Sequence, residues 1–274
     1  MHAQGSPSIL VSAAKTYNFV PQFSPDGRKI AFQTERSGYS EVWICDADGS
    51  NLAPATGLKG FAGTPRWSED GRYLAFDYRP RNHSEIHVLE VAGGRTHSVA
   101  AFPDADNMIP SWSRNGEWIY FGSNHGAKGV QIWKVAVKDG AATQTAPIQV
   151  TNHGGLAAFE SADGRRLFYT KLAETGIWTV PVEGGSESAM WPGPGPDHWS
   201  NWAVTENEIY ILAPQGTSPP EIQFLDFTTK RISRIATLEK PSFYGLTVSP
   251  DGSSLIYSQW DRYEHDILVL NNFR

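Results

Sequence analysis

The stretch FSPDGRKIAF, residues 23–32, decides the fold. Its two apolar ends flank the turn sequence Ser-Pro-Asp-Gly. Asp-Gly between apolar runs is a strong hairpin signal, because glycine readily takes the positive φ that a tight turn requires. Asp26-Gly27 therefore predicts a β-hairpin.

The same hairpin signal returns at a regular interval along the chain. The segment PQFSPDG (21–27) recurs as PRWSEDG (65–71), PSWSRNG (110–116), AFESADG (158–164), NWAVTEN (201–207) and LTVSPDG (246–252). The last residue of the turn is Gly in five of the six copies and Asn207 in the fifth, and Asn is also tolerant of positive φ. The chain is thus built from six units of about 45 residues.

The first five units each contain enough apolar runs for four strands, A to D. After the hairpin turn comes a run such as KIAFQT, then a second such as EVWICDA, and in five units a further short turn before a weaker run. Four antiparallel strands repeated at this interval are typical of a β-propeller blade. We predict an all-β fold, a six-bladed β-propeller of four-stranded antiparallel blades, that occupies residues 1–274 as a single domain.

The two ends of the chain predict how the ring closes. The sixth unit reaches its third run at DILVLNN without a fourth, whereas a spare run, SILVSAAK, precedes the first unit. We predict that residues 9–13 form the strand that completes the last blade, which removes the exposed edges of an open array. We interpret residues 1–8 as a tag or a disordered segment.

The repeat resembles the TolB-type (WD-like) β-propeller repeat family, whose units carry a Pro-x-Trp-Ser-Pro-Asp-Gly-like hairpin. Residues 21–34, 65–78 and 110–123 carry the likeness most clearly. The tail SQWDRYEHDILVLNNFR also resembles the end of propeller domains from bacterial winged-helix transcriptional regulators. The resemblance implies the propeller fold and, through the second likeness, a domain of a larger bacterial protein.

Composition excludes several classes of function. The net charge of −6 disfavours direct binding of nucleic acid by this domain, and the single cysteine, Cys45, excludes an internal disulfide and a cysteine-based zinc site. No apolar run approaches the length of a membrane helix, so we expect no membrane insertion. We expect a monomer, in either the cytoplasm or the periplasm.

Strand order predicts which face of the propeller binds. The A–B and C–D turns are short and share one face, so the longer B–C and D–A loops surround the channel mouth on the other. We expect the positions nearest the channel to be Asn18, Ala62, Asn107, Gly155, His198 and Phe243. The candidate binding residues at the mouth are Asn18, Arg36, Arg79, Asn107, His125, Lys171, His198, Trp199, Trp260 and Asp261. Such amide, basic and aromatic side chains suit a protein segment or a small polar or anionic ligand.

Enzyme signatures are scarce. The sequence has no Gly-x-Ser-x-Gly motif and no histidine pair with a helical metal-binding spacing. His125, His153 and His198 fall at comparable mouth positions, where they could together hold a divalent cation. We expect no catalytic residue and no cofactor.

We predict a non-catalytic propeller that binds a protein or a ligand, as a sensor or assembly domain of a larger bacterial protein such as a transcriptional regulator. The alternatives are a metal-dependent lyase or hydrolase that acts at the channel mouth, or the propeller half of a peptidase.

Overall fold

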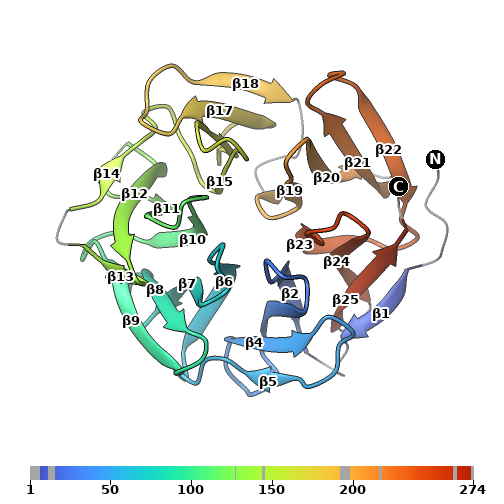
Figure 1. Cartoon of the computed structure of the whole chain (residues 1–274), viewed down its shortest axis with the longest axis horizontal. Helices are drawn as coiled ribbons and strands as arrows, with labels where there is room; N and C mark the ends of the chain where they lie inside the picture. Colours follow the sequence, from blue (N-terminus) through green and yellow to red (C-terminus); the bar gives the residue numbers. More distant parts are fainter. Residues whose placement is uncertain are drawn as a thin grey trace.

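The computed structural model describes residues 7–11, 16–126, 128–143, 146–191, 198–215, 218–261 and 264–272, apart from the side chains of residues 214, 215, 218, 261, 264 and 265. The chain forms a ring of six antiparallel sheets around a central axis, with β2, β6, β10, β15, β19 and β23 as the innermost strands (Figure 1). The predicted six-bladed all-β propeller is confirmed.

The strands of the first three blades follow the order of the sequence. Blade one consists of β2 (Asn18–Phe23), β3 (Lys29–Thr34), β4 (Glu41–Asp46) and β5 (Ala53–Pro54). Blade two consists of β6 (Phe61–Trp67), β7 (Tyr73–Arg79), β8 (Glu85–Glu90) and β9 (Arg95–Ala100). Blade three consists of β10 (Asn107–Trp112), β11 (Trp118–Ser123), β12 (Gln131–Lys138) and two short outer strands, β13 (Ala141–Ala142) and β14 (Ile148–Gln149).

The other three blades repeat the plan. Blade four consists of β15 (Ala158–Glu160), β16 (Arg166–Tyr169), β17 (Ile177–Pro181) and β18 (Ser188–Trp191). Blade five consists of β19 (Trp202–Val204), β20 (Glu208–Gln215), β21 (Ser218–Asp226) and β22 (Ile232–Thr237). Blade six consists of β23 (Ser242–Val248), β24 (Ser254–Asp261), β25 (Glu264–Asn271) and, as its outermost strand, β1 (Ser8–Val11).

The N-terminal strand closes the ring, as predicted. β1 pairs antiparallel with β25, with Ser8 opposite Val269 and Val11 opposite Ile267. The strand begins at Ser8, one residue before the predicted start, and the predicted positions 12 and 13 lie outside the described residues. The first and last segments of the chain thus share one blade.

The recurrent Ser-x-Asp-Gly sequence has a local physical cause. In blade one the Ser24 hydroxyl donates to Asp26 Oδ1 at 2.6 Å, and Asp26 Oδ1 accepts from the backbone N–H of Arg28. The same serine-to-Asx bond forms in blades two, three, four and six. The glycines that end these turns have φ between 68° and 72°. The side-chain bond adds to the backbone bond from Gly27 N–H to the carbonyl oxygen of Ser24, and together they favour the turn.

Blade five departs from this turn. Asn207 does not take the positive φ expected from the alignment with glycine. Instead the backbone N–H of Thr205 donates to the carbonyl oxygen of Glu208, which makes a shorter turn. Asn207 therefore belongs to a different type of turn and does not replace glycine in the turn of the other blades.

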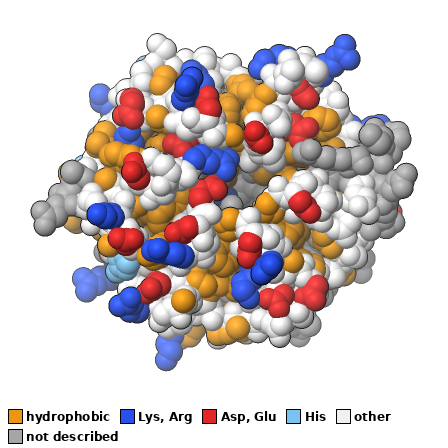
Figure 2. Space-filling model, viewed as in Figure 1, with side chains coloured by type: hydrophobic (Ala, Val, Ile, Leu, Met, Phe, Trp, Pro, Cys, Tyr) orange, Lys and Arg blue, Asp and Glu red, His pale blue; other side chains and the backbone are white. Residues whose placement is uncertain are grey.

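Charged side chains of both signs are interspersed over the face of the ring shown in Figure 2. Among the side chains visible there, neither sign forms an extended patch. An extended basic surface is what a nucleic-acid-binding domain presents, so this view offers no support for such binding. The described residues include no helix of the length and hydropathy needed to cross a bilayer.

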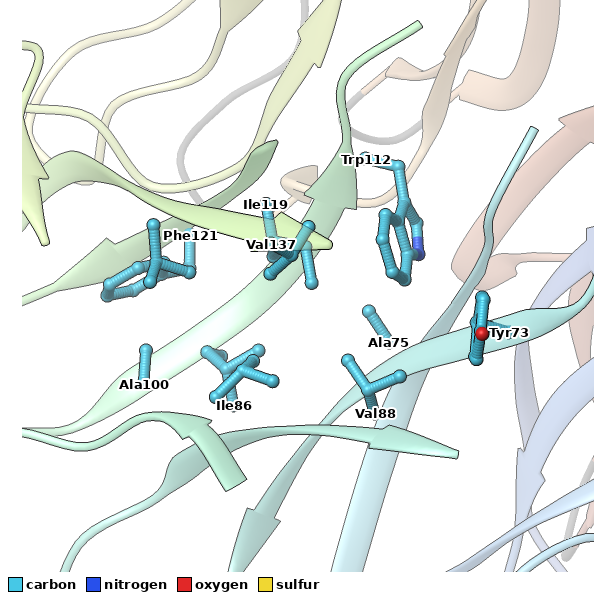
Figure 3. Close-up of a cluster of buried hydrophobic side chains, with 11 residues drawn as sticks. Tyr73, Ala75, Ile86, Val88, Ala100, Trp112, Ile119, Phe121 and Val137 are labelled. Atoms are coloured by element: carbon cyan, nitrogen blue, oxygen red, sulfur yellow. The ribbon is translucent and has the colours of Figure 1, made fainter. Parts of the chain in front are cut away.

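The core lies mainly between neighbouring blades. Tyr73, Ile86 and Val88 of blade two pack against Trp112 and Phe121 of blade three in one buried cluster (Figure 3). Trp112 stacks on Tyr73 with 6.3 Å between ring centroids, and its Nε1 donates to the carbonyl oxygen of Arg66 at 3.1 Å. The tryptophan of the repeated motif therefore joins one blade to the preceding one.

Candidate functional site

A cavity of about 740 Å³ opens where the B–C and D–A loops meet around the central axis. Its wall is mainly apolar, with contributions from all six blades, and consists of Tyr17, Phe19, Gln33, Glu35, Phe61, Thr64, Asp77, Met108, Ile109, Val130, Leu156, Leu172, Trp199, Phe243, Tyr244 and Trp260. We call it the mouth cavity. Its volume lies within the range of ligand pockets.

Bulges in the innermost strands shape the wall. The pairing register shifts in β2, β6 and β10, and at these bulges Val20, Thr64 and Ile109 adopt φ of 52°, 49° and 55°. Each is β-branched, so the left-handed conformation costs about 1–3 kcal/mol. Such strain persists only where surrounding structure holds it, and functional sites are where it is usually found.

An aromatic cluster forms the side of the mouth cavity near blades one, five and six. Phe243 lies edge-on to Phe19 at 5.8 Å and to Trp260 at 6.2 Å, measured between ring centroids. Tyr244 contacts Phe243 at 4.6 Å and stacks on Trp199 at 5.5 Å. These edge-on and stacked contacts hold the five rings in fixed relative positions.

The rim of the mouth cavity is apolar and exposed. Tyr17, Phe61, Leu172 and Trp260 are 45%, 49%, 50% and 50% exposed. They are four of the eight large apolar side chains that the structure records as exposed in the described chain. A concentration of this kind in one concave place marks an interaction site.

Two carboxylates also line the mouth cavity. Asp77 is only 7% exposed, and its Oδ1 accepts a hydrogen bond from the Thr64 hydroxyl at 2.8 Å. Burial raises the pKa of Asp77, against the opposing effects of the Thr64 hydroxyl and the backbone N–H of Ile109. Glu35 is exposed at the rim and makes no side-chain hydrogen bond or ion pair with any described residue. The cavity is therefore acidic as well as aromatic.

Replacement of Asp77 by Asn should stabilise the protein at neutral pH. A carboxyl group whose pKa is raised by folding stabilises the folded state most below its unfolded pKa, and this contribution is lost as the pH rises through the folded pKa. Asn keeps an oxygen acceptor for Thr64 and removes the buried charge. Thermal unfolding should show a higher melting temperature for Asp77→Asn at pH 7, and the difference should shrink as the pH falls toward 4. Equal melting temperatures at pH 7 would contradict a costly buried charge.

The structure brings together only part of the predicted site. Trp199 and Trp260 line the mouth cavity. Asn18 and Asn107 are instead fully buried: Asn18 accepts a hydrogen bond from Arg36 at 3.1 Å, and the Asn107 amide donates to the carbonyl oxygens of Ser84 and Ala105. The side chain of Asp261 lies outside the described part of the chain.

The residues that face the cavity are mostly one position later than expected. Phe19, Met108, Leu156 and Trp199 line it, rather than Asn18, Asn107, Gly155 and His198. Phe243 does line it, as expected, together with Tyr244. Successive residues of a strand point to opposite sides of the sheet. A prediction that is wrong by one position therefore names a buried residue instead of the neighbour that lines the cavity. The alternation of large apolar residues near each strand start was the signal that could have identified them.

The predicted basic residues point elsewhere. Arg36 lies over the Trp43 ring at 5.2 Å, and Arg79 forms an ion pair with Asp106 at 2.9 Å. Lys171 is buried, with its Nζ 3.6 Å from the centre of the Trp178 ring and 3.4 Å from Glu187. Arg36, Arg79 and Lys171 do not line the mouth cavity. An anionic ligand would require basic side chains in the wall, and the predicted ones do not lie there.

The three candidate metal-binding histidines have separate environments. His125 stacks on Phe102 at 3.9 Å, His153 is exposed with Glu187 at 3.5 Å, and His198 bonds the Asn201 amide at 3.3 Å. Within the described ranges, the structure shows no group of three His, Cys, Asp or Glu side chains that could hold a metal ion.

Comparisons with known proteins agree with this architecture. The family model for the TolB beta propeller domain matches residues 1–188. TolB from Acinetobacter baumannii superposes with a TM-score of 0.69 at 15% identity over 93% of this chain, which spans 63% of that one. The oligogalacturonate lyase of Vibrio parahaemolyticus superposes with a TM-score of 0.62 at 8% identity, over 99% of this chain and 95% of that one.

At such low identities the structural likenesses show the fold alone. No curated protein matches the sequence. The family match covers more than half of the chain. The chain belongs to the TolB β-propeller domain family.

Proposed function

We propose that the chain is a non-catalytic protein-binding module whose mouth cavity receives a segment of a partner protein. The observation that carries the proposal is the concave aromatic surface, in which Trp199 and Trp260 lie beside Tyr17, Phe61 and Tyr244. Aromatic side chains, tryptophan and tyrosine above all, supply much of the binding energy at protein interfaces.

The scaffold supports this role. Each blade contributes one wall to the mouth cavity, and the blades are packed together by buried inter-blade clusters. A rigid concave surface binds without first being ordered, which lowers the cost of association. Because the ring is closed by its own strand, no blade needs a strand from a second copy, and we expect the module to act as a monomer.

The metal-dependent lyase alternative is less well supported. One structural neighbour is an oligogalacturonate lyase, but the histidines that would serve such chemistry here lie in three separate environments. The resemblance of the C-terminal tail to winged-helix regulators has no support from these comparisons. A place as the sensor or assembly domain of a larger bacterial protein, such as a transcriptional regulator, stays a prediction.

Selection from a random peptide library displayed on phage would test the proposed function. Wild-type protein should enrich peptides whose binding, measured by isothermal titration, weakens about 10-fold or more in Trp260→Ala and in Trp199→Ala, the usual effect of losing an aromatic anchor. Melting temperatures of both variants should confirm that they are folded.

Tyr39→Ala is the matched control, because Tyr39 is an aromatic side chain of similar exposure that does not line the mouth cavity. Its peptide affinities should stay within about twofold of wild type. Enrichment of no peptide, or of peptides that bind the two tryptophan variants as well as wild type, would overturn the proposed function.

A further inference from the structure

We propose that the mouth cavity recognises a cationic side chain, Lys or Arg, on the partner segment. This inference rests on the proposed function and adds the chemistry of the group that enters. The sequence suggested a polar or anionic ligand, whereas this proposal names a cationic one. The difference arises because the residues of the wall are not those expected there.

The charges of the wall carry the first step. Among the described residues that line the mouth cavity, Glu35 and Asp77 are the acids, and none is Lys, Arg or His. The nearby basic side chains already have partners, Arg79 with Asp106 and Lys171 with Glu187. The described part of the wall therefore presents two carboxylates and no basic side chain of its own, an arrangement that complements a cation.

Asp77 is a buried carboxylate in the wall of the mouth cavity. A buried carboxylate is costly unless a cation or several hydrogen bonds compensate it. The structure records one side-chain partner for Asp77, the Thr64 hydroxyl, together with the backbone N–H of Ile109, and no ion pair. The buried Arg66 guanidinium interacts electrostatically with Asp77 but forms no ion pair with it. It lines the cavity at the other end of the channel, where it lies 5.0 Å from the centre of the Phe159 ring. A cation that enters from the mouth would place a counter-charge on the side of Asp77 that faces the mouth cavity, whose own wall, as far as it is described, contains no Lys, Arg or His.

The aromatic rings carry the third step. Lys and Arg pair a charged end with an apolar stem, and rings such as Trp260, Phe243 and Phe19 can pack on the stem while their faces attract the charge. Each cation–π contact contributes about 0.5–2 kcal/mol, more where water is excluded. An aromatic wall with an acid at its base thus discriminates a cation both from an anion and from an uncharged apolar group.

Three probes that share one apolar skeleton would test the charge preference: 4-phenylbutylammonium, 4-phenylbutanol and 4-phenylbutyrate. Titrations followed by tryptophan fluorescence and by ligand-observed NMR should show the ammonium ion binding about 5-fold or more tightly than the alcohol, and the carboxylate binding most weakly. Asp77→Asn and Glu35→Gln should each reduce the advantage of the ammonium ion over the alcohol about threefold, without weakening the alcohol.

Asp104→Asn is the matched control, because Asp104 is an exposed acid on a loop at the same end of the ring but does not line the mouth cavity. This control should leave the ammonium advantage unchanged. Equal binding of the ammonium ion and the alcohol, tightest binding of the carboxylate, or binding of none of the three would overturn the inference. If the probes show no preference for the ammonium ion, the inference about the cation is wrong, but the proposed protein-binding function is still tested by the peptide selection.

The selected peptides identify the source of the cation. Replacement of their lysine by norleucine, or of arginine by citrulline, should weaken binding to wild type about 5-fold or more and have little effect on binding to Asp77→Asn. Selected peptides without Lys or Arg, together with tight binding of the ammonium probe, would show that the cavity takes a free organic cation and would overturn the assignment to a protein segment.

Discussion

Removal of residues 1–11 should lower the melting temperature by about 10 °C, because it takes away the outermost strand of blade six. Val11 is buried among Phe23, Phe32, Ile256 and Ile267, so its loss alone costs about 1.5–3 kcal/mol of hydrophobic stabilisation. The deletion also removes the strand-to-strand hydrogen bonds to β25 and exposes the edge of that strand. Thermal unfolding followed by circular dichroism would measure the effect.

Two point variants distinguish the stabilisation that comes from burial of Val11 from that of the rest of strand β1. Val11→Asp places a charge in the cluster and should lower the melting temperature nearly as much as the deletion, whereas Ser8→Asp, at an exposed position of the same strand, should change it little. Light scattering of the deletion variant should reveal association through the opened edge. An unchanged melting temperature after deletion would show that β1 does not hold the ring closed.

Gly245→Ala should reduce the free energy of unfolding by about 3 kcal/mol or more. Gly245 has φ of 119°, and a Cβ atom there would lie 2.5 Å from Cδ of Pro21 and 2.7 Å from Cα of Val20. Blade six therefore approaches the innermost strand of blade one too closely for any side chain. Denaturant unfolding would measure the loss, and the aromatic cluster that includes Phe243 and Tyr244 should be displaced with it.

Gly38→Ala isolates the backbone part of that cost. Gly38 also has a positive φ, 88°, but nothing lies within 4 Å of where its Cβ would be. Its substitution should cost about 1–2 kcal/mol, the penalty of the left-handed conformation alone. The difference between the two variants then measures the contact between blades six and one. Equal losses in both would contradict a steric contact at Gly245.

The architecture was predictable because its causes are local and repeated. Ser24, Asp26 and Gly27 form their turn through bonds within five residues, and the same bonds recur in four other blades. The unit with Asn207 was the exception, since its alignment hid a shorter turn. Closure by the N-terminal strand followed from counting strands at the two ends, which needs no knowledge of side-chain contacts.

The wall of the mouth cavity was less predictable. Trp199 and Trp260 were predicted because the strand order places the D–A and B–C loops, to which they were assigned, at the channel mouth. Asn18 and Asn107 were misplaced by one position, since the bulges at Val20 and Ile109 cannot be located from the alternation of residues alone. Asp77 was missed because it lies in a strand, not in the loops on which the prediction concentrated.

The six units, their four strands and the face on which the cavity opens all follow from the sequence, because turn chemistry and strand alternation act within a few residues. The charge of that cavity, by contrast, depends on how the blades pack together. Arg36, Arg79 and Lys171 each contact a ring or a carboxylate from another strand or loop, and none of the three lines the mouth cavity. Such pairings depend on residues far apart in sequence. The number of basic residues in the loops therefore suggested an anionic ligand, whereas the described wall of the folded cavity carries two carboxylates and no basic side chain.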